Sequence, residues 1–227
     1  MEYRRTGCIY DNPLAADAHT ASFVLEGSAA IAHRDGGMRM ENRLDPSIGQ
    51  EANFVYWCPE IFPDDIEIAW DFTPLREPGL CMLFFAARGR DGADLFDPGL
   101  ERREGVYRQY HSGDIDALHV SYFRRKAAKE RTFNVCNLRK SRGFHLVAQG
   151  ADPIPTVADA SGPYRIRVVK SGPDVQFGID GLTLFEWRDD GLTCGPVLGG
   201  GRIGFRQMAP LVAAYGNLTV HRIERID

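Results

Sequence analysis

The stretch "PYRIRVVKSGPDVQFGIDGLTLFEWR" (163–188) decides the fold class of this chain. Apolar and polar side chains alternate along most of it with a period of two, which is typical of β-strands that have one buried face. Asp180 and Gly181 form a dipeptide that favours a tight hairpin turn. The stretch therefore predicts consecutive strands joined by short turns.

The same period runs through most of the remaining sequence, and no helix longer than two turns is indicated. Prolines break the pattern at the ends of several runs, because proline cannot donate to a strand ladder. The further predicted strands are 22–27, 29–34, 37–42, 53–59, 65–72, 80–87, 117–125, 133–140, 143–150, 201–208 and 213–225. About a dozen strands predict two packed antiparallel sheets in one domain, 1–227, a length that all-β domains commonly reach.

One long loop, at about 88–116, interrupts the regular spacing of the strands. Loops beyond about 12–15 residues are uncommon and are usually functional or disordered. This loop contains the run "LFDPGLERREGVYRQYHSGD" (95–114), which has too many apolar and aromatic residues for plain disorder. We therefore expect it to have a function.

Composition and charge exclude several classes of protein. The chain is 44% hydrophobic and 26% charged, and its net charge of −4 argues against a general nucleic-acid binder. No apolar run is long enough to span a membrane, and the N-terminus has no signal-peptide pattern, so we expect a cytoplasmic protein. The five cysteines show no zinc spacing, and neither a metal nor another cofactor is expected. The chain could form a homodimer.

Several long motifs carry a resemblance to a known family. The last seventy residues resemble the concanavalin-like lectin/glucanase superfamily. Nearly the whole chain after about Gln50 resembles the YesU-like family of bacterial proteins, in the segments "NFVYWCPEIFPDDIEIAWDFTPLREPGLCMLFFAA" (53–87), "YRQYHSGDIDALHVSYFRRK" (107–126), "CNLRKSRGFHLVAQGADPIP" (136–155) and "GPVLGGGRIGFRQMAPLVAAYGNL" (195–218). The resemblance implies a concanavalin-like jelly roll of two curved sheets. It also implies a link to the breakdown of plant or algal polysaccharides.

Acidic residues on one predicted strand form the first candidate site. In "DDIEIAWDF" (64–72), alternation places Asp65, Glu67 and Asp71 on one face, and same-face neighbours lie about 6.6–7 Å apart. Carboxyl separations of about 5–5.5 Å suit retaining glycosidases and about 6.5–9.5 Å suit inverting ones. Glu67 is therefore a candidate catalytic residue. The alternative is a solvated outer face with scattered acids, since Ala69 stands where a third acid would help.

A basic cluster forms the second candidate site. Eight Lys and Arg residues lie between 124 and 142, with a single acid among them. Arg124 and Arg139 lie in predicted strands, and a planar guanidinium binds a carboxylate through two parallel hydrogen bonds. These two residues are candidates for recognising a uronate. Lys126 and Lys129 are assigned to a solvated loop.

Polar side chains accompany these arginines on the predicted strands. Alternation pairs Tyr122 with Arg124, Asn137 with Arg139, and His145 with Gln149. If the three strands are neighbours, one face could bind a uronate, and Tyr122 or His145 could transfer protons in a β-elimination. The alternative is that these residues are only the polar half of amphipathic strands.

Other candidates come from single positions. His111 lies at a junction between loop and strand, where a catalytic residue is well placed, whereas His119 is predicted to be a core histidine. Trp57 is the preferred aromatic platform for a sugar ring, with Glu60 as its polar partner, although Trp57 could equally belong to the core. Arg206 is a further candidate for binding substrate.

These residues favour a carbohydrate-active protein. We expect an intracellular glycoside hydrolase or a lyase that acts on a short oligosaccharide, which could contain a uronate. The alternatives are a lectin-like binding protein without catalysis and a structural interaction domain without a sugar ligand.

Overall fold

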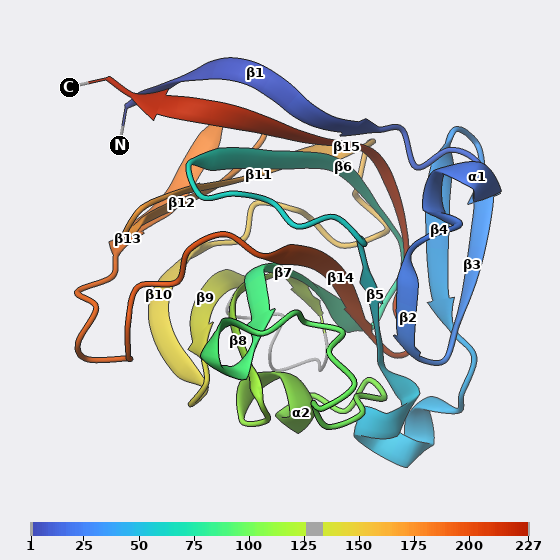
Figure 1. Cartoon of the computed structure of the whole chain (residues 1–227). Coiled ribbons are helices and arrows are strands. Elements are labelled where there is room, and N and C mark those ends of the chain that lie inside the picture. The colour runs from blue at the N-terminus through green and yellow to red at the C-terminus, as the bar shows by residue number, and fades with distance from the viewer. Residues whose placement is uncertain (1, 126–133, 227) are drawn as a thin grey trace.

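Two antiparallel sheets, packed face to face, contain all the named strands of residues 2–125 and 134–226, which the computed structural model describes (Figure 1). The strands of the first sheet are β1 (Tyr3–Asn12), β3 (Ala29–Arg34), β4 (Gly37–Asn42), β6 (Ile66–Arg76), β11 (Tyr164–Ser171), β12 (Asp174–Ile179), β13 (Leu182–Arg188) and β15 (Val212–Arg225). They run in the order β13-β12-β11-β6-β15-β4-β3, and β1 pairs with the C-terminal half of β15.

The second sheet has seven strands: β2 (Val24–Gly27), β5 (Phe54–Trp57), β7 (Gly79–Gly89), β8 (Ile115–Arg125), β9 (Val135–Ser141), β10 (His145–Ala151) and β14 (Arg202–Met208). They run in the order β10-β9-β8-β7-β14-β5-β2. The helices within the described residues are short: α1 (Asp17–Thr20), α2 (Arg108–His111) and two 3₁₀ segments, Pro46–Ala52 and Arg90–Gly92. The prediction of a two-sheet jelly-roll sandwich is confirmed.

The stretch 163–188 forms β11, β12 and β13, with Asp180 and Gly181 at the β12–β13 turn. The strand β1 was not predicted. Most of its side chains are exposed, so its sequence shows no clear alternation. It pairs with β15, so the two ends of the chain lie side by side in one sheet (Figure 1).

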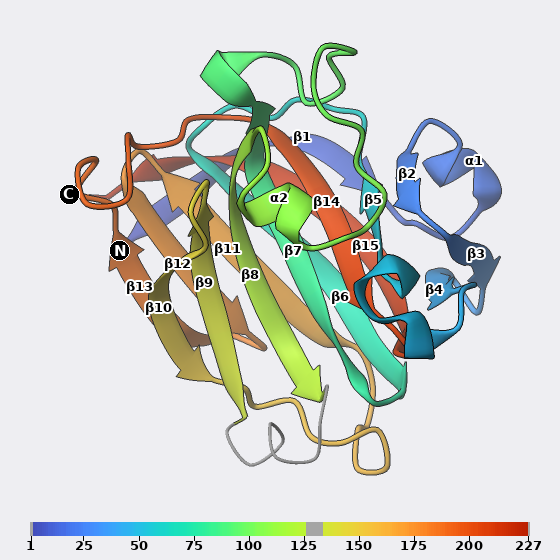
Figure 2. The same ribbon diagram turned by 90° about the horizontal axis from the view of Figure 1, so that it is seen from below.

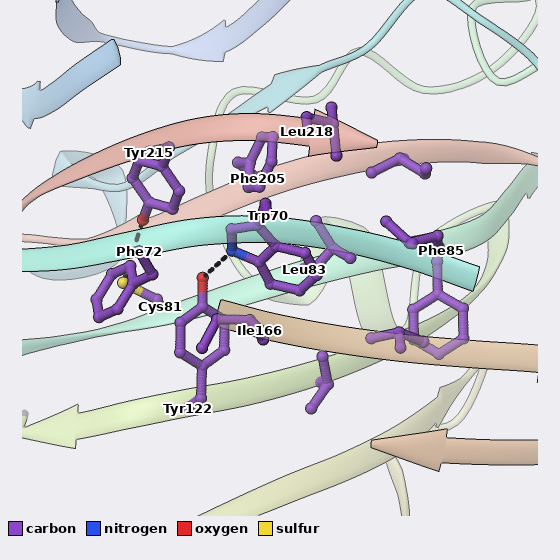
Figure 3. Close-up of a cluster of buried hydrophobic side chains, with 14 of the residues drawn as sticks. Trp70, Phe72, Cys81, Leu83, Phe85, Tyr122, Ile166, Phe205, Tyr215 and Leu218 are labelled. Carbon is purple, nitrogen blue, oxygen red and sulfur yellow. Dashed lines mark hydrogen bonds between the residues drawn. The ribbon is translucent and has the colours of Figure 1, made fainter. Parts of the chain in front are cut away.

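The core lies between the sheets and is rich in aromatic side chains (Figure 3). The Trp70 ring lies 5.8 Å from that of Tyr122 and 5.9 Å from that of Phe205. The Trp70 indole Nε1 donates to the Tyr122 hydroxyl at 3.1 Å. Burial of each large side chain contributes about 1.5–3 kcal/mol, so this cluster stabilises the sandwich.

A second, smaller core lies on the outer face of the seven-stranded sheet. The segment between β7 and β8 folds over that face, with α2 above the central strands (Figure 2). Tyr110 of this segment packs on Trp57 and Phe84, with ring centroids 6.4 and 5.5 Å away. The predicted loop 88–116 is therefore packed against the sheet, which explains its apolar content.

Two contacts hold this segment in place. Gly105 has a φ of +92°, and a Cβ there would lie 2.0 Å from the Asn53 carbonyl oxygen, so only glycine fits. The carbonyl oxygen of Gly105 accepts a hydrogen bond from Arg206 Nη1 at 2.6 Å. The segment is thus fixed directly above β14.

Two β-bulges determine which side chains face outward. In β8, Phe123 has a φ of +47°, and three residues span the interval that two residues span in β7. In β10, one extra residue lies between Leu146 and Ala148. Each bulge reverses the alternation of faces beyond it. Both therefore alter the predicted site.

Candidate functional site

The outer face of β8, β9 and β10, beside α2, gathers several of the predicted residues. We call this surface the arginine face, and it consists of His111, Arg124, Asn137, Arg139, Phe144 and Gln149. Arg124, Arg139 and His111 are half-buried, Gln149 is exposed, and the Phe144 ring is 39% exposed. The sheet positions these groups because neighbouring strands align their outward side chains.

Asn137 links the two ends of the arginine face. It lies opposite Gln149 in the ladder, and Gln149 Nε2 donates to its amide oxygen at 2.8 Å. If the Asn137 amide is instead turned by 180°, its oxygen accepts from Arg124 Nη1 at 3.2 Å and its nitrogen faces Gln149. Arg124, Asn137 and Gln149 therefore form a row of amide and guanidinium groups across three strands.

Arg139 and His111 flank the Phe144 ring. The Arg139 guanidinium lies 3.8 Å from the ring centroid, and its Nη1 donates to the Phe144 carbonyl oxygen at 2.8 Å. The His111 ring centroid lies 4.3 Å from that of Phe144. The His111 Nδ1 contacts Ser112 Oγ at 2.7 Å, whereas Nε2 has no hydrogen bond to the described residues.

The half-buried Tyr107 and the buried His119 form a pair beside this surface. The hydroxyl of Tyr107 is 2.6 Å from His119 Nε2, and His119 is fully buried. Burial lowers the pKa of His119 to about 3, and the positive charges of Arg139 and Arg206 act in the same direction. Burial raises the pKa of Tyr107 to about 12. His119 is therefore neutral and Tyr107 protonated at neutral pH.

The same arginines also act on His111. Its pKa is lowered by burial and by the charges of Arg139, Arg206 and Arg108, which keeps the imidazole neutral near pH 7. Burial, followed by Arg124, lowers the pKa of Arg139. Guanidinium groups are thus the main charges that act on all three titratable groups of this region, Tyr107, His111 and His119.

The described part of the chain supplies no acid to balance these charges. No ion pair is formed there by either Arg124 or Arg139, whose guanidinium groups contact amide, carbonyl and aromatic groups. Within the same residues, no three His, Cys, Asp or Glu side chains gather in a way that could hold a metal ion. The arrangement suits an anionic group supplied by a ligand.

The prediction that Tyr122 shares a face with Arg124 is wrong. Both Tyr122 and Phe123 point into the core because of the bulge, while Arg124 points outward. Tyr122 is completely buried, and its hydroxyl accepts from Trp70 (Figure 3). It has no access to a ligand and is a structural residue. His119 is buried as predicted, but under the outer segment and not between the sheets.

The predicted pairing of His145 with Gln149 is also wrong. His145 lies opposite Lys140, whereas Gln149 lies opposite Asn137, because the bulge in β10 separates them. Lys140 points away from the arginine face, towards Asp189. His145 therefore lines a different cavity, at the end of the sheet, together with Lys140.

Trp57 is not an exposed platform for a sugar. Its side chain is completely buried beneath the loop, and its indole Nε1 donates to Glu26 Oε2 at 2.8 Å. Glu60 lies beyond the end of β5 and is exposed, so Glu26 is the carboxylate that serves Trp57. The prediction that Glu60 is its polar partner is wrong.

Glu67 and Arg206 are both buried, in different sheets. Glu67 lies on the outer face of β6 in the eight-stranded sheet, where it pairs with Arg5 at 2.5 Å and accepts from the Tyr3 hydroxyl at 2.6 Å. It cannot act together with the arginine face. Arg206 underlies the loop, and burial lowers its pKa to about 10. It therefore supports Tyr107 from below and does not contact a ligand directly.

Sequence reasoning missed Tyr107 and Phe144. Tyr107 lies in the long loop that is predicted to be functional, but no local sequence pattern shows which face of which sheet the loop covers. Phe144 is the aromatic residue of the hairpin between β9 and β10.

Three residues of the basic cluster lie outside the described residues: Lys126, Lys129 and Arg131. The cysteines Cys58, Cys81 and Cys136 are buried, as expected for strand interiors.

Comparisons with known proteins give the family. Residues 7–220 match a domain of unknown function, DUF1961. The chain is 53% identical to the uncharacterized protein YesU of Bacillus subtilis (strain 168), over 98% of this chain and 99% of that protein. A crystal structure of a protein of unknown function with a galectin-like fold from Bacillus subtilis superposes with a TM-score of 0.95, at 53% identity, over 99% and 100% of the two chains.

More distant structures share the fold alone. The carbohydrate recognition domain of Emp47p superposes with a TM-score of 0.60, at 14% identity, over 95% of this chain and 97% of that one. The β-glucanase of Bacillus licheniformis gives a TM-score of 0.57, at 9% identity, over 96% and 99%. Of the helices in the described residues, none is long and apolar enough to cross a membrane. With its jelly-roll sandwich and a match over nearly its whole length, the chain belongs to the DUF1961 family, the family of YesU.

Proposed function

We propose that this protein binds an acidic oligosaccharide on the arginine face. The observation that carries the proposal is the excess of positive charge there. Guanidinium groups act on Tyr107, His111 and His119, and Arg124 and Arg139 form no ion pair within the described residues. A carboxylate or sulfate group of a sugar would supply the missing negative charge through charge-assisted hydrogen bonds.

The remaining groups of this face suit the neutral parts of a sugar. The exposed Gln149 offers an amide donor and acceptor for hydroxyl groups, with the buried Asn137 behind it, and the exposed part of the Phe144 ring offers an apolar surface. The distant structures that share the fold include a carbohydrate recognition domain and a β-glucanase. These resemblances support a carbohydrate ligand, and the charge of the site supports an acidic one.

The chemistry that this face supports best is β-elimination from a uronate. Arg124 and Arg139 would hold the carboxylate and stabilise the charge that develops on it. The neutral His111 would take the proton from the carbon next to the carboxylate through Nε2. The electron pair of the broken C–H bond would form the C=C bond, and the glycosidic C–O bond would break. Tyr107 would donate a proton to the departing oxygen and regain one from solvent, while His111 would release its proton to solvent.

Hydrolysis by a pair of carboxylates has less support. Such enzymes place two Asp or Glu side chains on either side of the scissile bond. The predicted acid Glu67 lies on the other sheet, and in the described residues no carboxylate contacts Tyr107, His111 or Arg139. We therefore place elimination ahead of hydrolysis.

A specific observation favours binding without catalysis as the second candidate. Burial raises the pKa of Tyr107 to about 12, and its hydroxyl already contacts His119 at 2.6 Å. A tyrosine hydroxyl that is held by a hydrogen bond to a histidine is equally suited to positioning a ligand without transferring a proton. A lectin-like protein would use the same arginine face and show no turnover.

The single domain, the cytoplasmic location and the homodimer stay predictions from sequence.

Titration calorimetry tests the proposal, with uronate, sulfated and neutral oligosaccharides of equal length as ligands. We expect the acidic sugars to bind and the neutral ones not to bind. Arg139→Ala should abolish binding, while Arg139→Lys, which keeps the charge and loses the planar fork, should retain part of it. Arg4→Ala is the matched control, because Arg4 is an exposed arginine in the other sheet, paired with Glu224.

Mass spectrometry of the incubated sugars then separates the reactions. Elimination gives fragments whose masses sum to that of the substrate, and one fragment carries a new double bond. Hydrolysis adds one water to that sum, and a lectin leaves the sugar intact. Equal binding of neutral and acidic sugars, or full binding by Arg139→Ala, would overturn the proposal.

A further inference from the structure

A cavity of about 600 Å³ lies at the end of the seven-stranded sheet, next to the hairpin that joins β9 and β10. This volume falls within the range of about 300–1,000 Å³ that is typical of small-molecule sites. Its lining includes Asp116, Ser141, Arg142, His145, Thr193 and Cys194. The arginine face includes none of these side chains, and among them only His145 and Arg142, the last residue of the basic cluster, belong to the predicted sites.

One polar atom of this cavity lacks a partner. The side chain of Ser141 is 1% exposed, and its Oγ has no hydrogen-bond partner among the described residues. A buried hydroxyl without a partner costs free energy, so its presence in a cavity wall points to a ligand that completes it. Ser141 ends β9 and lies two residues after Arg139, on the same face of the strand, at a spacing of about 6.6–7 Å.

The cavity and the arginine face share a wall. The hairpin residues Arg142 and His145 line the cavity, whereas Phe144, between them, packs against Arg139 and His111 on the arginine face. The hairpin is held to α2 by a hydrogen bond from the Gly143 N–H to the His111 carbonyl oxygen at 2.8 Å. A ligand longer than one ring could therefore extend from one side of the hairpin to the other.

The two cations of the cavity are paired with carboxylates, in contrast to those of the arginine face. Arg142 Nε donates to Asp116 Oδ1 at 3.1 Å, and Lys140 Nζ pairs with Asp189 Oδ2 at 2.6 Å. Paired charges of this kind offer donors and acceptors side by side, which suits sugar hydroxyl groups. Asp91 adds a further carboxylate to the lining, so the cavity offers no net positive charge that would attract a second carboxylate.

From these observations, and resting on the proposed function, we propose that this cavity binds a neutral sugar ring joined directly to the acidic ring on the arginine face. The substrate is then a mixed oligosaccharide, in which a uronic acid and a neutral, hydroxyl-rich sugar are neighbours. The Ser141 hydroxyl and the Arg142–Asp116 pair bind the neutral ring.

The thiol of Cys194 provides a reporter for occupancy of this cavity. Cys194 is half-buried in the cavity wall, Cys8 is exposed on β1 of the other sheet, and the other three cysteines are buried. Alkylation by iodoacetamide, followed by peptide mass spectrometry, measures both thiols in one sample. The probes are a uronic acid monosaccharide and two disaccharides of one uronic acid and one neutral hexose, linked in the two opposite orders.

We expect one of the two disaccharides to protect Cys194. At ten times its Kd the empty fraction falls to about one eleventh, so alkylation of Cys194 should slow about ten-fold, while Cys8 reacts at an unchanged rate. The monosaccharide should bind without protecting Cys194. In Ser141→Ala the Kd of the protecting disaccharide should rise by about 2- to 12-fold, as for one lost hydrogen bond, with no change for the monosaccharide.

The outcomes separate the two proposals. If no acidic sugar binds, the proposed function fails and the cavity proposal fails with it. If the monosaccharide binds but neither disaccharide protects Cys194 or binds more tightly, only the cavity proposal is overturned. Protection by the monosaccharide alone would place the acidic ring in the cavity and would likewise overturn it.

Discussion

The guanidinium group of Arg139 lies 3.8 Å from the centre of the Phe144 ring, while its Nη1 donates to the carbonyl oxygen of the same residue. One residue of the β9–β10 hairpin therefore holds this arginine from two sides. The cation–π contact and the hydrogen bond orient the guanidinium before any ligand arrives. A group that is already oriented loses less conformational entropy when it binds a carboxylate.

Phe144→Leu should weaken the binding of acidic sugars without unfolding the protein. The variant keeps the carbonyl oxygen and loses the ring, so the cation–π contribution of about 0.5–1 kcal/mol should disappear and the Kd should rise about 2- to 5-fold. Titration calorimetry measures this change. Leu182→Ala, which alters an exposed apolar residue of the other sheet, is the control. An unchanged Kd in Phe144→Leu would show that the ring does not orient Arg139.

Glu26→Gln should destabilise the protein strongly. The Glu26 carboxylate pairs with Arg103 at 2.8 Å and accepts from Trp57 Nε1 at 2.8 Å, and both charged groups are buried. Loss of the negative charge leaves a buried cation without its partner, which costs about 3–5 kcal/mol. Urea unfolding measures the free energy. The control Glu224→Gln breaks an exposed pair with Arg4 and should cost only about 0–1 kcal/mol. Equal losses in both variants would contradict the burial of Arg103.

Tyr122→Phe should change stability and leave ligand binding intact. The variant leaves the buried Trp70 N–H without its acceptor, at a cost of about 1–3 kcal/mol. His111→Gln should behave in the opposite way, with sugar turnover lost and the free energy of unfolding little changed. Urea unfolding and the mass of the sugar products give the two readouts. Loss of turnover in Tyr122→Phe at full stability would restore Tyr122 as a catalytic residue.

Most of the fold could be predicted from the sequence because alternation and turns are local. In β12 and β13 apolar side chains recur at alternate positions, and the two strands turn at Asp180 and Gly181, so both features are visible in a short window. The strand β1 was not predicted because it pairs along one edge of β15 and buries little of its own surface. A strand held mainly by backbone pairing leaves a weak sequence pattern.

The site could be predicted only in part because one inserted residue reverses every face beyond it. Tyr122 and Phe123 are equally suited to a core, so nothing in the sequence marks the bulge that turns both inward. The same kind of insertion separates His145 from Gln149. The sequence nevertheless predicted correctly that four residues share one face of the sheet: Arg124, Asn137, Arg139 and Gln149. The bulges leave all four side chains on the outer face.

Removal of His119 should reduce the acid sensitivity of the fold. In the native protein the pKa of this imidazole is about 3, because it is buried and faces Arg139, Arg206, His111 and the Tyr107 hydroxyl. In the unfolded chain its pKa returns to about 6.5. The unfolded state therefore binds more protons between these two values, and the free energy of unfolding must decrease as the pH falls through this range.

The contribution of His119 is fully present above pH 7 and decreases by about 1.4 kcal/mol per pH unit below about pH 6.5. Between pH 7 and pH 5 the wild-type protein should lose about 2 kcal/mol more than His119→Gln, which has no imidazole to protonate. Urea unfolding of both proteins at pH 7, 6 and 5 measures the difference, and the other histidines cancel in the comparison. If both proteins lost the same free energy over this range, the imidazole of His119 would take up protons in the folded state. Burial beneath the loop would then not be enough to keep the imidazole of His119 neutral.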